Sequence, residues 1–151
     1  MTDLHRTWRA TFTRRWHSNP DLCQTHDPVG AHSARVALIM LALWPDTSRE
    51  AIVAALMHDL AESVVGDLPP AGKSMLANAA TAERLIATQN GWHIALKDVD
   101  ATRLRFADQL DAFMWADHHR ATDTDEWHDA REMLVYQAER LGVRKKLEDI
   151  L

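Results

Sequence analysis

The segment ALMHDLAESVVGDLPP, residues 55–70, places a histidine, two aspartates and a glutamate at the end of an apolar stretch. A helix through this stretch would be apolar nearly all the way round, because it carries Ile52, Val53, Leu56, Met57 and Leu60. We therefore expect a central, buried helix in which His58 and Asp59 have little access to water. A buried carboxylate costs several kcal/mol unless a cation or hydrogen bonds compensate it. A metal ion would do so, because neutral imidazole and carboxylate oxygens are common ligands of zinc, manganese, iron or cobalt.

Two residues elsewhere in the chain can complete such a metal site. His32 lies on the apolar side of a helix predicted over 28–44, and Asp108 borders the apolar side of a helix predicted over 100–119. Asp111 borders the same side and is the alternative to Asp108. The four predicted ligands are His32, His58, Asp59 and Asp108. Their two nitrogens and two oxygens would leave coordination positions for water or a phosphate oxygen.

The elements that must bring these residues together are all predicted to be helices. The sequence has no alternating strand pattern, glycine-rich loop or internal repeat, which indicates an all-α, single-domain helical bundle over 1–151. The predicted helices span 4–16, 28–44, 48–65, 72–90, 100–119 and 125–141. Ser48 is a predicted N-cap, and Gly66, Gly91 and Gly142 are predicted to end helices.

Composition limits the class of protein. With 46% apolar residues over 151 positions, the chain can bury a core without disulfides, and Cys23 is its only cysteine, as is typical of a reducing cytoplasm. No apolar run reaches the length of a membrane span and no signal peptide opens the chain, so we expect no membrane partner. The net charge of −5 argues against a nucleic-acid partner but permits a local basic pocket for a small phosphorylated ligand.

Five short motifs, taken in order, resemble the HD-domain metal-dependent phosphohydrolases. They are RRW at 14–16, HS at 32–33, HDLAE at 58–62, GDLP at 66–69 and ADQLDA at 107–112. RRW is similar to the arginine–tryptophan pair of bacterial 5′-deoxynucleotidases, and GDLPPAGK resembles their loop after the metal helix. The modest distance between the HD pair and the last aspartate is similar to that of the compact phage dATP triphosphohydrolases. The resemblance covers about residues 14–115.

The resemblance implies metal-dependent hydrolysis of 2′-deoxynucleotides at the α-phosphate. The ion would be zinc, cobalt, manganese, iron or magnesium. A triphosphohydrolase acting on dATP releases deoxynucleoside and triphosphate, whereas a 5′-deoxynucleotidase releases phosphate from a monophosphate. We expect the triphosphohydrolase first, because three basic residues are available for the phosphate oxygens: Arg15, Lys73 and Arg105. By analogy with the relatives we expect a homo-oligomer, a dimer or a hexamer, in the cytoplasm of a bacterium or a phage-infected host.

The resemblance also implies roles for three further residues. Glu62 would accept the proton of the attacking water or hold that water in line. Asp67 would orient the water, the sugar hydroxyl or the leaving 5′-oxygen. Trp16 corresponds to a tryptophan that packs on the sugar and disfavours a 2′-hydroxyl, so we expect a preference for deoxyribose.

Two non-enzymatic interpretations stay open at this point. The chain could be a nucleotide-binding HD module without turnover, or a structural helical domain in which His58 and Asp59 form a buried hydrogen-bonded couple. A module that has lost activity usually lacks one or more ligands. This chain retains all four and also Glu62, which favours an enzyme.

Overall fold

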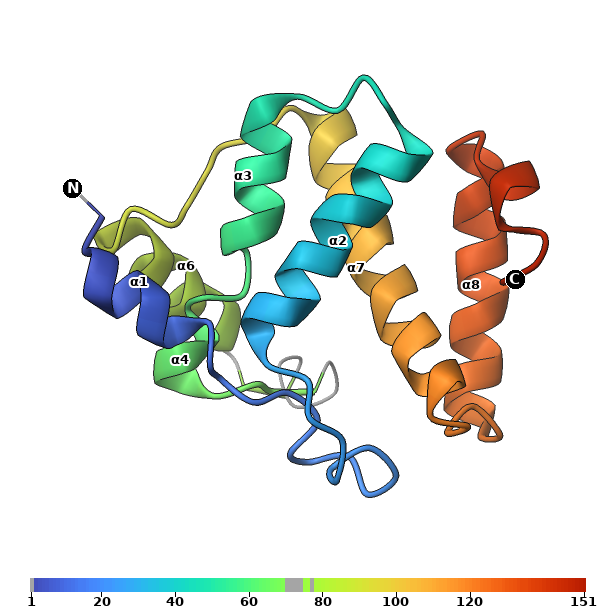
Figure 1. Cartoon of the computed structure of the whole chain (residues 1–151), viewed down its shortest axis with the longest axis horizontal. Coiled ribbons are helices and arrows are strands. Elements are labelled where there is room, and N and C mark those ends of the chain that lie inside the picture. Colours follow the sequence, from blue (N-terminus) through green and yellow to red (C-terminus); the bar gives the residue numbers. More distant parts are fainter. Residues whose placement is uncertain (1, 70–74, 77) are drawn as a thin grey trace.

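The protein is an α-helical bundle in a computed structural model that describes residues 2–69, 75–76 and 78–151 (Figure 1). The helices are α1 (Leu4–Ala10), α2 (Val29–Leu43), α3 (Arg49–Met57), α4 (Glu62–Val65), α6 (Ala79–Gln89), α7 (Asp98–His118), α8 (Asp125–Arg140) and the 3₁₀ helix η1 (Arg144–Leu147). Within those ranges there is no strand, only an isolated bridge between Arg14 and Pro28. The predicted all-α class is confirmed. No helix in the described part of the chain combines the length and apolar character needed to cross a membrane.

Helices α2 and α7 form the centre of the bundle. They pack against each other, α3 packs against both, and α8 covers the other side of α7 (Figure 1). The short helices α1, α4 and α6 lie at the opposite end from α8, near the N-terminus. The central pair therefore fixes the relative positions of any side chains that α2 and α7 carry.

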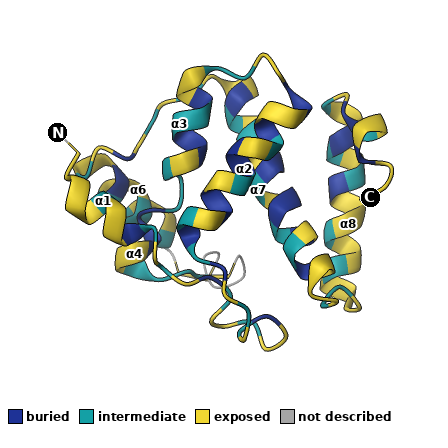
Figure 2. Cartoon of the chain, in the orientation of Figure 1, coloured by how far each residue is buried: buried dark blue, intermediate teal, exposed yellow. Residues whose placement is uncertain are grey.

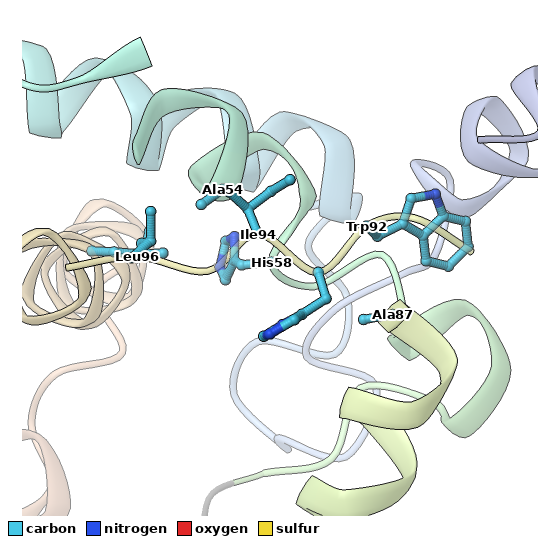
Figure 3. A pocket seen from close by; sticks show the side chains of 8 residues that line it. Ala54, His58, Ala87, Trp92, Ile94 and Leu96 are labelled. Carbon is cyan, nitrogen blue, oxygen red and sulfur yellow. The ribbon is translucent and has the colours of Figure 1, made fainter. Parts of the chain in front are cut away.

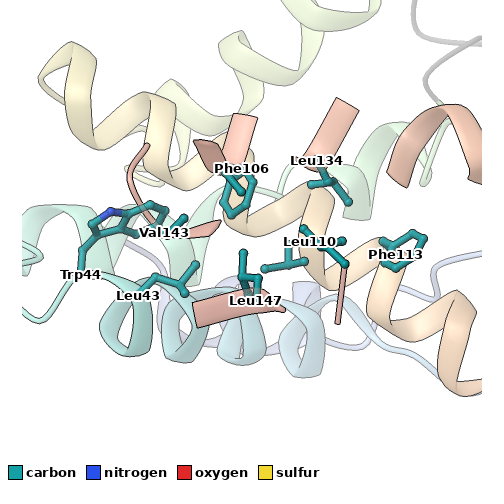
Figure 4. Packing of buried hydrophobic residues seen from close by; sticks show 10 residues of the cluster. Leu43, Trp44, Phe106, Leu110, Phe113, Leu134, Val143 and Leu147 are labelled. Atoms are coloured by element: carbon teal, nitrogen blue, oxygen red, sulfur yellow. The ribbon is translucent and has the colours of Figure 1, made fainter. Parts of the chain in front are cut away.

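Two of the three apolar clusters in the described residues hold the central helices together. Figure 2 shows the buried positions along these helices. The larger cluster joins the end of α2 to α7, α8 and η1 (Figure 4). Its members are Leu43, Trp44, Phe106, Leu110, Phe113, Leu134, Ala138, Val143, Leu147 and Leu151. A second cluster packs Val36, Ala37 and Met40 of α2 against alanines of α3 and α7. Small residues on α3 and α7 let these helices approach α2 closely.

Several helix ends lie where the sequence predicts them. Ser48 caps α3, because its side-chain oxygen accepts a hydrogen bond from the backbone N–H of Ala51 at 3.1 Å. Gly91 and Gly142 follow α6 and α8 with φ values of 69° and 70°. Gly66 follows α4 with φ 84° and ψ 158°, a conformation open essentially only to glycine. These glycines turn the chain where a side chain would be strained.

The prediction of one continuous helix over 48–65 was wrong. Helix α3 ends at Met57, and α4 begins only at Glu62. The Nδ1 of His58 donates to the carbonyl oxygen of Ala55 at 2.8 Å, which is the oxygen that the next helical N–H would use. After this point the backbone N–H groups bond to carbonyls three residues back, as in the pair of Glu62 with Asp59 at 3.0 Å. A histidine side chain thus interrupts the helix.

The predicted burial of that helix on all sides was also wrong. Only the alanine face of α3 is buried: Ala51, Ala54 and Ala55. Leu56 is 44% exposed. The helix lies on the outside of the α2–α7 pair, and its larger side chains Ile52 and Met57 are only partly buried against the neighbouring apolar clusters.

The N-terminal helix is shorter than predicted. It ends at Ala10 instead of continuing to Trp16, and the side chains of Thr11 and Thr13 accordingly bond to carbonyls of the last turn at 2.7 and 2.9 Å. Trp16 has φ 66°, a left-handed backbone conformation that cannot be part of a right-handed α-helix. In the helix predicted over 72–90, α6 begins at Ala79, and residues 70–74 and 77 lie outside the described residues.

Candidate metal centre

All four predicted metal ligands meet at one point of the bundle. Helix α2 carries His32, the turn after α3 carries His58 and Asp59, and α7 carries Asp108. Nε2 of His32 lies 3.3 Å from Nε2 of His58, 3.3 Å from Oδ2 of Asp59 and 3.1 Å from Oδ1 of Asp108. One ligand atom from each residue lies within 4.8 Å of the others.

The spacing of these atoms and their chemistry fit a divalent ion. Nε2 of His58 is 3.3 Å from Asp59 and 3.7 Å from Asp108. Ligands bound at about 2.0–2.2 Å from a shared ion are separated from one another by roughly 3–3.7 Å. Two imidazole nitrogens and two carboxylate oxygens suit zinc, manganese, iron or cobalt, and the donor set alone does not single out one of them.

Both histidines present the correct nitrogen to the centre. Nδ1 of His32 donates to Oδ2 of Asp111 at 2.7 Å, and Nδ1 of His58 donates to the carbonyl of Ala55 at 2.8 Å. In the neutral rings the protons therefore sit on Nδ1, and the lone pairs of both Nε2 atoms are free for an ion. The same bond that ends α3 thus also orients His58.

The interruption of the helix explains how two adjacent residues share one site. On a regular helix, His58 and Asp59 would point about 100° apart. In the tight turn between α3 and α4, their ligand atoms come within 3.3 Å of each other. The turn is therefore part of the site and not only a connection.

The charges of the cluster are strongly coupled. Burial alone would lower the pKa of His32, but its hydrogen bonds to Asp108, Asp111 and Asp59 raise that pKa to about 10. The pKa of His58 is also raised: burial opposes its charge, but Asp59 and Asp108 outweigh burial. Burial acts to raise the pKa values of the carboxyl groups of Asp59 and Asp108, yet the two imidazoles hold both below the ordinary range. Without an ion, the carboxylates retain a proton on the histidines.

Asp111, the alternative to Asp108, lies on the other side of His32. Its Oδ2 bonds to Nδ1 of His32, while Asp108 faces Nε2. The structure therefore separates the two aspartates of the ADQLDA motif. Asp108 belongs to the cluster of candidate ligand atoms, and Asp111 orients His32.

Glu62 and Asp67 lie on the chain that leaves the metal-ligand turn. Glu62 is the first residue of α4 and only 4% exposed, one turn after His58. Asp67 follows Gly66, and its Oδ2 accepts a hydrogen bond from the backbone N–H of Trp16 at 2.7 Å. Asp67 thereby ties this chain to the loop that carries Arg15 and Trp16.

The predicted substrate-binding residues are placed differently from one another. Arg15 is buried, and its Nη1 lies 3.0 Å from Oδ2 of Asp27 and 3.7 Å from Oδ2 of Asp111. Trp16 is half-buried beside it, with the Arg15 guanidinium 4.8 Å from the centre of its ring. Arg105 is exposed and bonds to Thr102 on its own helix at 3.3 Å. Lys73 lies outside the described residues.

Sequence reasoning missed two residues beside the centre, Asp27 and Arg35. Asp27 is fully buried and pairs with both Arg15 and Arg35. Arg35 also bonds to Asp111. A usable signal existed for Arg35, since it stands three residues after His32 and Asp111 stands three residues after Asp108. For Asp27, in a loop without a helical period, the sequence offers no such signal.

A small cavity borders the centre on the side of His58 (Figure 3). Its volume is about 200 Å³, and its lining comes from α3, α6, α7 and the segment between α6 and α7. The lining residues are Ala54, His58, Ala87, Trp92, His93, Ile94, Leu96 and Leu104. Pockets for drug-sized ligands are larger, about 300–1,000 Å³, so this cavity fits a small apolar group and not a whole nucleotide.

The helical fold and the cluster of two histidines and two aspartates define a metal-binding helical domain. Residues 29–142 match the model of the HD domain family, and the chain belongs to this family. The fold is similar to the crystal structure of the PH0347 protein from Pyrococcus horikoshii OT3, with a TM-score of 0.71 and 22% identity over 97% of this chain and 93% of that one. Among curated proteins there is no match. The family and the cluster together indicate a metal-dependent hydrolase.

Replacing Asp59 by alanine is expected to remove metal and activity together. The change removes one candidate ligand atom. It also leaves one carboxylate fewer to balance the positive charge of an ion. Elemental analysis of the purified variant should show a metal content far below a stoichiometric amount. Asp46→Ala is the matched control, because the side chain of Asp46 is 74% exposed and pairs only at the surface with Arg103. Retained turnover in Asp59→Ala would contradict the ligand assignment.

Metal binding is expected to release protons at neutral and mildly alkaline pH. The pKa of about 10 keeps His32 protonated below that pH in the metal-free protein, whereas a ligand imidazole must be neutral. Apparent affinity should therefore rise with pH, by about tenfold per unit for each proton released between about pH 7 and 9. Calorimetry in two buffers of different ionisation enthalpy measures this release. A binding heat independent of the buffer would show that His32 is already neutral.

Proposed function

We propose that this protein is a phosphohydrolase that cleaves 2′-deoxynucleotides at the α-phosphate with the help of a divalent ion. The observation that carries the proposal is the position of the four-ligand cluster next to a fixed Arg15–Trp16 pair. Asp111 touches both parts, since it bonds to His32 at 2.7 Å and lies 3.7 Å from Arg15. A phosphate at the cluster and a sugar at Trp16 would then belong to the same substrate.

The ion would supply a water of lowered pKa and polarise a non-bridging phosphate oxygen. His32, His58, Asp59 and Asp108 would hold it. Glu62 is proposed to take the proton of the attacking water or to hold that water, since it is buried one turn after His58.

The proposed preference for deoxyribose is supported by the way Trp16 is held. Its backbone N–H bonds to Asp67 at 2.7 Å and its indole Nε1–H bonds to Asp27 at 3.0 Å. The left-handed backbone of a non-glycine residue costs on the order of 1–3 kcal/mol, which these two bonds offset. A ring fixed at both ends cannot move aside for an additional 2′-hydroxyl. In this proposal Asp67 acts by holding Trp16 in place.

The length of the phosphate chain has two candidate answers. The three basic residues predicted from the sequence favour dATP as a triphosphate substrate. The charges around Arg15 favour a monophosphate, because this guanidinium is already balanced by Asp27 and Asp111. A 5′-deoxynucleotidase needs fewer cations than an enzyme that accommodates β- and γ-phosphates. We therefore retain this second activity beside the first.

The partners remain a small deoxynucleotide and further copies of the chain, with no role for nucleic acid. Self-association is supported by exposed apolar residues along α1 and the turn that follows it: Leu4 and Trp8 on the helix, and Phe12, whose ring contacts that of Trp8. A dimer or hexamer in the cytoplasm would cover these residues. Sedimentation of the purified protein measures the assembly.

The activity is tested by incubating the metal-loaded protein with all deoxynucleoside mono- and triphosphates and the matching ribonucleotides. Phosphorus NMR of the products distinguishes the alternatives directly. Inorganic triphosphate identifies a triphosphohydrolase, and inorganic phosphate from monophosphates alone identifies a nucleotidase. If the protein binds metal but releases no phosphate, the interpretation as a nucleotide-binding module without turnover is supported. If the purified protein contains no metal, the interpretation as a structural helical domain is supported.

Replacing Glu62 by glutamine is expected to preserve metal binding and to reduce hydrolysis by about 100-fold or more, because the amide cannot accept a proton. Metal content and turnover are measured on the same sample. Glu50→Gln in the exposed first turn of α3 is the control and should leave both unchanged. Loss of metal together with activity would instead assign Glu62 to the ligands of the ion.

A further inference from the structure

Asp27 is a carboxylate that joins three partners out of contact with solvent. It is 0% exposed. Its Oδ2 accepts hydrogen bonds from Nη1 of Arg15 and from Nε1 of Trp16, both at 3.0 Å, and its Oδ1 accepts one from Nη2 of Arg35 at 2.8 Å. A buried charge is stable only when it is paired in this way. The direction of the Trp16 indole therefore depends on where Asp27 is held.

Asp111 has a parallel position on the metal side. It accepts a hydrogen bond from Nδ1 of His32 at 2.7 Å. Arg35 binds the same carboxylate through two nitrogens, with Nε at 2.7 Å from Oδ1 and Nη2 at 3.0 Å from Oδ2. This forked contact fixes both oxygens, which a single point charge cannot do. The orientation of His32 therefore depends on Asp111, and that of Asp111 on Arg35.

Arg35 is the one side chain in the described part of the chain that bonds to both carboxylates through short contacts. Its Nη2 lies 2.8 Å from Asp27 and 3.0 Å from Asp111. Its guanidinium also stacks on Trp115, with 4.5 Å between the guanidinium carbon and the centre of the ring. Arg15 reaches Asp111 only at 3.7 Å. The ring of Trp115 and the two carboxylates fix the guanidinium on three sides.

We propose that Arg35 is a positioning residue that aligns the metal ligand His32 through Asp111 and the indole of Trp16 through Asp27. One arginine thus couples the geometry of the metal centre to that of the neighbouring tryptophan. The metal half of this proposal stands independently, whereas its consequence for the sugar rests on the proposed function. The described hydrogen bonds and ring contact of Arg35 go to Asp111, Asp27 and Trp115, so its effect on His32 and Trp16 passes through the two carboxylates.

Arg35→Lys tests the coupling because it keeps the positive charge and removes the fork. Affinity for Co²⁺ measured by calorimetry should fall by about 10–100-fold, the effect typical of losing a group that orients a ligand. Nitrogen-15 NMR should show faster solvent exchange of the Trp16 indole N–H, with the resonance assigned from Trp16→Phe. Neither measurement requires turnover.

Arg103→Lys is the matched control. Arg103 also stacks on a tryptophan, Trp44, at 5.2 Å and pairs with an aspartate, Asp46, at 3.4 Å, but it lies away from the centre. This variant should leave Co²⁺ affinity and the Trp16 resonance unchanged. Unchanged values in folded Arg35→Lys would overturn the proposal, and a change in only one of the two would overturn the coupling.

Asp27→Asn provides a second test if Arg35→Lys does not fold. The amide has the shape of the carboxylate but lacks its charge, so it holds Arg35 less tightly. Asp27 has no described contact with any of the four ligands, yet the proposal expects weaker Co²⁺ binding along with exposure of the Trp16 indole. Full Co²⁺ affinity in this variant would show that Arg35 does not transmit the effect.

The consequence for the sugar is measured as the ratio of the dissociation constant of AMP to that of dAMP, which exceeds one when deoxyribose is preferred. Arg35→Lys should reduce this ratio toward one, because a mobile indole admits the 2′-hydroxyl. A wild-type protein that hydrolyses no nucleotide would end the proposed function. The Co²⁺ and indole measurements would still decide the role of Arg35, so the two failures are distinguishable.

Discussion

The site depends on the hydrogen bond between Nδ1 of His32 and the carboxylate of Asp111. At 2.7 Å and out of contact with solvent, it joins α2 to α7 across the centre of the bundle. It sets the tautomer of His32 and leaves Nε2 facing the other ligand atoms. Because α2 and α7 are also the central packed pair, the apolar cluster that holds them together preserves this bond. Core packing and the geometry of the metal centre therefore both require the same relative position of α2 and α7.

Charge divides the carboxylates in and around the centre into two groups. Asp27 and Asp111 face the guanidinium groups of Arg15 and Arg35. Asp59 and Asp108 face the imidazoles, and in the described part of the chain no arginine pairs with them. The arginines thus compensate Asp27 and Asp111, and no described arginine compensates Asp59 and Asp108. Burial would lower the pKa of His32, but its hydrogen bonds to Asp108, Asp111 and Asp59 raise that pKa.

The sequence predicted that these two histidines and two aspartates come together, because their signal is local. His58 and Asp59 are adjacent in an apolar stretch, and His32 and Asp108 lie on the apolar edges of long helices, each of which was found nearly where predicted. The network around Arg35 could not be predicted in the same way, because its bonds to Asp111 and Asp27 join residues 76 and eight positions apart in the chain. Such a pairing depends on how separate segments of the chain are arranged in space, and the periodicity of the sequence carries no information about that arrangement.

The broken helix shows a second limit of sequence reasoning. Residues 48–65 have the composition of one helix, but the side chain of His58 bonds to the carbonyl of Ala55 at the point where the helix breaks. Intrinsic propensity treats a histidine as a mild influence on a helix, so it cannot indicate that one imidazole will compete for a backbone acceptor. Yet this competition makes the tight turn that brings His58 and Asp59 to a single point. The hydrogen bond of His58 to Ala55, which lies where the predicted helix breaks, therefore also helps to assemble the predicted metal centre.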